Sequence, residues 1–116
     1  ICAGALAEIY QSLGGAVTYG GKPHARIYAS AMDRVSALLG DAVERRRVLA
    51  VGDSVATDIA GANANGFDAV FITGAGGVND EINNGVDDRR VLEDQIMALL
   101  GEHDARAVAV MERLTW

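Results

Sequence analysis

Two short apolar runs constrain the fold of this chain more than any other feature. Arg47 to Val51 (RVLAV) and Phe67 to Thr73 (FDAVFIT) are continuous rather than alternating, a pattern typical of strands covered on both faces. Segments near 25–39 and 55–64 show the three-and-four apolar spacing of helices. Strands that alternate with helices indicate right-handed crossovers and a parallel sheet. We therefore predict an α/β fold that occupies residues 1–116 as a single domain.

Weaker patterns predict the remaining elements. Gly4 to Leu13 has the spacing of an amphipathic helix and is followed by a Gly-Gly pair, and Val91 to Leu100 is a second clear helix. The β-branched stretch 16–20 predicts a further strand, parallel to the strands near 47–51 and 67–72. Gly74 to Gly85 is rich in Gly and Asn and is expected to form a loop, and the tail to Trp116 is a candidate for another helix.

Composition excludes several classes of function. The net charge of −6 argues against a protein that binds the nucleic-acid backbone, and no apolar run reaches the ~20 residues that a membrane helix needs. The single cysteine, Cys2, cannot form an internal disulfide, which fits a reducing cytoplasm. The chain opens in an apolar helical pattern without a secretory signal, as a trimmed or partial chain would. We expect a cytoplasmic protein.

Two acids follow the first apolar run. Ligands bind beyond the carboxyl ends of parallel strands, and Asp53 stands one residue past such an end, after Gly52, which permits a sharp exit. Asp58 lies five residues on, in the first turn of the next helix, so its carboxylate can turn back to the same crevice. Paired carboxylates suit Mg²⁺. The alternative is that Ser54 caps this helix and Asp58 complements its dipole.

A lysine precedes the helix near 25–39. Gly20 and Gly21 let the backbone approach a ligand closely, and Pro23 favours an extended Lys22 and can open the helix. A lysine at a helix N-terminus is a point charge suited to a phosphoryl oxygen. His24 is a weak candidate for substrate binding and otherwise a surface histidine.

These segments together resemble the haloacid dehalogenase (HAD) superfamily. The family's third motif, a lysine ahead of a helix, corresponds to Lys22 in GGKPH, and its fourth, an acidic pair at a strand end, to Asp53 and Asp58 in GDSVATDIAGANANG. The segments GKPH and FDAVFITGAGG resemble the corresponding segments of the large-cap subclass, which includes p-nitrophenyl phosphate and sugar-phosphate phosphatases. The resemblance implies a three-layer, Rossmann-like parallel sheet with helices on both faces, of which this chain is the C-terminal half of the core.

The family's first motif, an Asp-x-Asp that supplies the nucleophile, does not occur in the sequence. By resemblance it lies ahead of Ile1 with most of the cap, so this chain alone is expected to be inactive. The resemblance implies a Mg²⁺-dependent phosphatase that forms an aspartyl-phosphate. In it Asp53 binds the metal directly, Asp58 holds a metal-bound water, and Lys22 neutralises the nucleophile and a phosphoryl oxygen. Ser54 would assist a metal water or cap the helix.

The expected partners are a phosphate-ester small molecule and the missing N-terminal half of the same protein, with no nucleic acid and no membrane; assembly into a homo-oligomer stays open. The alternative is a non-catalytic α/β binding module similar to a phospho-acceptor receiver domain, or a degenerate family member kept for subunit interaction. In receiver domains the acidic cluster precedes the lysine, whereas Lys22 precedes Asp53 here.

Overall fold

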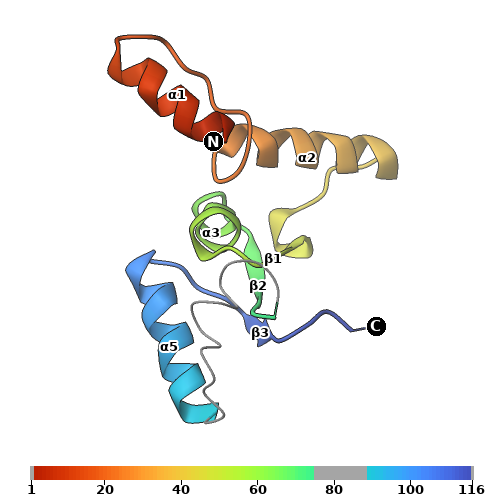
Figure 1. Cartoon of the computed structure of the whole chain (residues 1–116). Helices are drawn as coiled ribbons and strands as arrows, with labels where there is room; N and C mark the ends of the chain where they lie inside the picture. Colours follow the sequence, from red (N-terminus) through yellow and green to blue (C-terminus); the bar gives the residue numbers. More distant parts are fainter. Residues whose placement is uncertain (1, 75–88, 116) are drawn as a thin grey trace.

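The computed structural model describes residues 2–74 and 89–115. Its elements follow in the order α1 (Ala3–Ser12), α2 (Ala25–Leu39), the 3-10 turn η1 (Arg45–Arg47), β1 (Leu49–Gly52), the π-helical turn η2 (Val55–Ile59), α3 (Ala60–Ala64), β2 (Asp68–Ile72), α5 (Arg89–Glu102) and β3 (Ala109–Met111). Figure 1 shows α1 and α2 standing away from the sheet, with α3 between them and the strands. The radius of gyration is 16.5 Å, against about 13 Å for a compact domain of this length.

The three strands form one parallel sheet in the order β1-β2-β3. Along one edge of β2, Leu49 pairs with Asp68 and Gly52 with Phe71. Along its other edge β2 pairs with β3, so that Val70 lies opposite Ala109. The α/β prediction with a parallel sheet is confirmed. None of the helices in the described ranges is long and apolar enough to cross a bilayer.

Most of the core lies on one face of this sheet, while Val70 of β2 is buried on the other. Alternate residues of β2, Ala69 and Phe71, have no exposed surface and pack against η2, α3 and α5. The buried cluster consists of Val55, Ile59, Ala62, Phe67, Ala69, Phe71, Ile96, Leu100 and Ala105. On the opposite face Leu49 and Val51 remain 52% and 48% exposed. In the described part of the chain, the expected second layer of helices is therefore not seen over β1.

Helix α2 has the predicted bounds, and its ends explain them. His24 precedes it in extended conformation, and Gly40 ends it with a positive φ of 72°, donating its N–H to the Ser36 carbonyl. Such a left-handed residue is the usual helix stop that glycine allows. Tyr28 and Met32 lie on the side that packs against the core cluster.

One predicted strand is absent, one begins later than predicted, and one strand was not predicted. Residues 16–20 form no strand: no described segment pairs with them, and a β-branched run gains little without a ladder. Arg47 belongs to η1, so β1 begins at Leu49. Ala109–Met111 is a strand where a helix was considered, because it completes the sheet beside β2.

Other boundaries shift little. Helix α1 runs over Ala3–Ser12, α5 extends the predicted 91–100 helix at both ends, and the single helix expected near 55–64 is divided into η2 and α3. The predicted loop from Gly74 to Gly85 lies, apart from Gly74, outside the described residues.

Candidate functional site

The chain leaves β1 through Gly52, Asp53 and Ser54 and then enters η2. The wide turn of η2 arises because the Ser54 carbonyl accepts hydrogen bonds from both Asp58 N, at 2.9 Å, and Ile59 N, at 3.2 Å. The Ser54 hydroxyl also accepts from Thr57 N at 3.4 Å and so caps this turn. Ser54 therefore has the capping role that the sequence offered as one of its two interpretations.

Asp58 turns back from η2 onto the end of β1. Its Oδ2 accepts hydrogen bonds from the backbone N–H groups of Asp53 and Ser54, each at 3.1 Å. The residue is only 8% exposed. Buried carboxylates require such donors because an unpaired buried charge is costly.

Gly52 makes room for this carboxylate. A Cβ at position 52 would meet the Asp58 side chain at 2.3 Å from its Cβ and 2.5 Å from Oδ2. The sequence interpretation assigned Gly52 to a sharp exit from the strand, but the structure gives close packing as the reason, since Gly52 does not have a positive φ.

Lys22 reaches the same carboxylate from a distant part of the sequence. Its Nζ lies 2.5 Å from Asp58 Oδ1, and its side chain is 56% exposed. The lysine stands in a four-residue turn that is closed by a 3.0 Å hydrogen bond from His24 N to the Gly21 carbonyl. The sequence had suggested that Pro23 opens α2. In the structure Pro23 lies inside this turn, and α2 begins at Ala25.

The ion pair shifts the acid–base behaviour of both groups. The hydrogen bond to Asp58 raises the pKa of Lys22, although partial burial acts in the opposite direction. Burial by itself would raise the pKa of Asp58, but the hydrogen bonds from Lys22 and from the Ser54 and Asp53 backbone outweigh it, so that pKa lies below its usual value. Both groups are therefore charged at neutral pH.

Asp53 is the acid with free ligand capacity. Its side chain is half-buried, and its carboxylate makes no hydrogen bond within the described part of the chain. Asp58 already accepts from three donors, so it suits contact with a cation through water better than direct ligation. Within residues 2–74 and 89–115, His, Cys, Asp and Glu side chains do not gather in groups of three that could hold a metal. The donors present fit a hard cation only as part of a larger ligand set.

His24 has no part in this cluster of Lys22, Asp53 and Asp58. Its exposed ring stacks on Tyr19 with the centroids 4.7 Å apart and the planes at 21°. It precedes α2 without a side-chain capping bond. The contacts of His24 thus give no support to its weak assignment to substrate binding.

Sequence reasoning missed the residues beneath the lysine turn. Tyr28 stacks on Phe67, and its hydroxyl is 3.5 Å from the Thr57 carbonyl. Asn65 donates from Nδ2 to the carbonyls of Pro23, at 3.3 Å, and Gly61, at 2.8 Å. Nothing in the sequence around Asn65 signals a bond that spans 42 positions.

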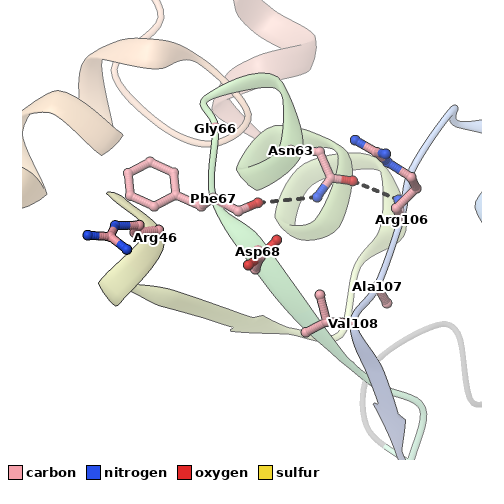
Figure 2. Close-up of a pocket in the computed structure, with 8 residues that line it drawn as sticks. All are labelled: Arg46, Asn63, Gly66, Phe67, Asp68, Arg106, Ala107 and Val108. Carbon is pink, nitrogen blue, oxygen red and sulfur yellow. Dashed lines mark hydrogen bonds between the residues drawn. The ribbon is translucent and has the colours of Figure 1, made fainter. Parts of the chain in front are cut away.

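A hollow of about 440 Å³ lies elsewhere, at the amino end of β2 (Figure 2). Its lining residues are Arg46, Asn63, Gly66, Phe67, Asp68, Arg106, Ala107 and Val108. In Figure 2 the guanidinium groups of Arg46 and Arg106 lie on opposite sides and do not converge. Because Gly52 is level with Phe71 at the other end of the strands, this hollow is separate from the cluster around Asp58.

Comparison with known proteins identifies the family of this chain. A family described as HAD-hydrolase-like matches residues 19–94, a range that contains Lys22, Asp53 and Asp58. No curated protein matches the chain. Among solved structures, a haloacid dehalogenase-like hydrolase from Brucella suis 1330 superimposes with a TM-score of 0.68 at 35% identity.

That alignment covers 98% of this chain but only 37% of the Brucella protein, so the chain spans little more than a third of its relative. The family match extends over more than half of the chain, and it includes the turn with Lys22 and the whole of β1, η2, α3 and β2. The chain belongs to the HAD-like hydrolases.

Proposed function

We propose that this chain contributes the lysine and the acidic motif to the active site of a Mg²⁺-dependent phosphatase that works through an aspartyl-phosphate. The observation that carries the proposal is the contact between Lys22 and Asp58 at the carboxyl end of β1, beside Asp53. A positive and a negative group held together at a strand end are suited to a phosphate ester and its counter-cation.

Lys22 acts on the charge of the phosphate. An ammonium has three N–H donors, and the contact with Asp58 uses one of them. Because the side chain is 56% exposed, the remaining donors can reach a phosphoryl oxygen beside the sheet. Asp58 keeps the lysine charged and fixes its position, since Asp58 itself is held by two backbone N–H groups.

Asp53 would hold Mg²⁺ directly, and Asp58 would contact it through water. The cation would supply charge neutralisation at the phosphate. The nucleophilic aspartate belongs, in this proposal, to residues ahead of Ile1, because the sequence contains no Asp-x-Asp. This chain is then the C-terminal part of the hydrolase core, and the substrate is a small phosphate ester.

The test is hydrolysis of p-nitrophenyl phosphate with Mg²⁺ by a longer protein that includes the residues ahead of Ile1. Asp53→Asn removes the charge that the cation requires, and Lys22→Met removes the charge at the phosphate. Each is expected to lower kcat/KM by about 10²-fold or more. Asp58→Asn should lower it less than Asp53→Asn if Asp58 contacts the ion through water.

Asp68→Asn is the matched control, because Asp68 is an exposed acid at the opposite end of the sheet. It should leave activity unchanged. The 116 residues alone are expected to show no turnover. Hydrolysis by the 116 residues alone, or full activity of Asp53→Asn, would refute the proposal. Absence of hydrolysis by the longer protein would refute it as well and would favour the non-catalytic module.

A further inference from the structure

The turn that carries Lys22 rests directly on α3. Gly61 is buried, and a Cβ there would lie 2.6 Å from the Tyr28 hydroxyl and 2.8 Å from Pro23 Cα. Contacts this short do not occur between real side chains, so only glycine at position 61 lets the turn sit so close to the helix.

A single side chain then joins the turn to the end of α3. Asn65 Nδ2 donates to the Pro23 carbonyl at 3.3 Å and to the Gly61 carbonyl at 2.8 Å. In the described ranges, the only other side-chain hydrogen bond between residues 20–24 and the η2–α3 segment is that of Lys22 with Asp58. The turn is therefore attached at two points, a backbone carbonyl and an ammonium group.

Of these two attachments, only the hydrogen bond from Asn65 holds the backbone of the turn. The contact with Asp58 holds the end of the Lys22 side chain, whose flexible four-carbon stem leaves the backbone of the turn less constrained. Asn65 is half-buried, and its side-chain amide donates directly to a backbone carbonyl of the turn, that of Pro23. The hydrogen bond from Asn65 therefore fixes the backbone from which the Lys22 side chain extends.

We propose that Asn65 is a positioning residue that, through the Pro23 carbonyl and with the space left by Gly61, places Lys22 against Asp58. Its catalytic consequence rests on the proposed function, but the placement itself does not. The competing explanation is that Asn65 merely ends α3 through its bond to Gly61. The two explanations differ in what happens to Lys22 when only the bond to Pro23 is lost.

The chain offers a matched control in Asn63. It lies two residues earlier on α3, and its side chain bonds to the Phe67 carbonyl at 3.3 Å and to Arg106 N at 2.7 Å (Figure 2). Asn63→Ala thus removes an amide with two backbone partners, like Asn65, but away from the lysine turn.

Lys22 is the only lysine of the chain, so the α-amino group is the other amine that reacts, and peptide mapping separates the two. The experiment measures acetylation of Lys22 in the 116-residue chain by an N-hydroxysuccinimide ester at one fixed pH, with mass spectrometry of the peptide that contains Lys22. Asn65→Ser is the main variant, because its short hydroxyl can still bond to the Gly61 carbonyl four residues back but cannot reach Pro23. We expect acetylation about 3- to 10-fold faster than in the parent chain, corresponding to one lost hydrogen bond.

Gly61→Ala, which leaves Asn65 in place, should accelerate acetylation in the same way, and Asn63→Ala should leave the rate unchanged. Urea unfolding of each variant separates loss of placement from loss of the fold. Equal acetylation rates in Asn65→Ser, Asn63→Ala and the parent would overturn the proposal. Because no turnover is measured, failure here is distinct from failure of the phosphatase assay.

Discussion

Replacing Gly52 by alanine tests the packing at the end of β1 most directly. The added methyl would lie 2.3 Å from Asp58 Cβ and 2.4 Å from Cγ, where ordinary contacts are no closer than about 3.4 Å. Neither atom belongs to a flexible chain end, since Asp58 is held by two backbone N–H groups and by Lys22. Gly52→Ala must therefore push Asp58 out of its place.

The expected loss of stability has two parts. Overpacking of a tight site costs about 1–3 kcal/mol. Hydrogen bonds to a charged group contribute roughly 1.5–3 kcal/mol each, and displacing Asp58 strains the two that its Oδ2 accepts. The Lys22 ion pair adds little because that lysine is largely exposed. Taking the strain as equivalent to the loss of about one of these two hydrogen bonds, we expect a decrease of about 3–5 kcal/mol in the free energy of unfolding.

Urea denaturation followed by circular dichroism measures this decrease as a midpoint lower by about 2 M. Gly101→Ala is the control, because a Cβ there meets nothing within 4 Å and alanine favours the helix. In an Asp58→Gly background the clash is absent, and Gly52→Ala should then cost less than about 1 kcal/mol. If Gly52→Ala and Gly101→Ala unfold at the same urea concentration, Asp58 does not pack against Gly52 and the reasoning is wrong.

Two further predictions concern the ion pair and the core. Since the pKa of Asp58 lies below its usual 3.8, its contribution to stability is present above that value and is lost as the pH falls through the lowered pKa. Since the pKa of Lys22 is raised above 10.5, its contribution to stability is present below 10.5 and is lost as the pH rises through the raised pKa. Thermal melts across pH should show both losses of stability. Asp58→Asn should reduce both. Phe71→Ala is expected to lower the free energy of unfolding by about 3–5 kcal/mol, because Phe71 is fully buried. Leu38→Ala, at a residue 77% exposed, should change it by less than about 0.5 kcal/mol, and similar losses for the two variants in urea would contradict the assigned core.

Features with a local physical cause could be predicted from the sequence. Helix α2 was predicted over 25–39 because apolar residues recur there with helical spacing. The strands β1 and β2 followed from continuous apolar runs, and their parallel pairing followed from the helix between them. The segment Ala107 to Met111 has the same continuous apolar pattern, which favours the observed strand β3 over the helix expected for the tail.

Features that depend on a distant partner could not be predicted. Residues 16–20 have strand propensity, but strands exist only where a neighbour completes the ladder. Lys22 and the two acids could be expected near one sheet edge, yet not which acid would meet the lysine. That choice depends on the wide turn at Ser54, which swings Asp58 back over Gly52, and a five-residue spacing does not reveal it.

The order in which the strands pair has a consequence for synthesis of the chain. The paired residues Leu49 and Asp68 are 19 positions apart in the sequence, whereas Val70 and Ala109 are 39 positions apart. Closing the longer loop costs about 0.6 kcal/mol more in entropy, a minor difference. Timing matters more, because the ribosome releases β1, α3 and β2 while β3 and Leu100 are still to be made. Until then the nascent chain lacks the α5 residues that complete the core around Phe71, so a pause in translation after β2 would leave it most prone to aggregate or to recruit a chaperone.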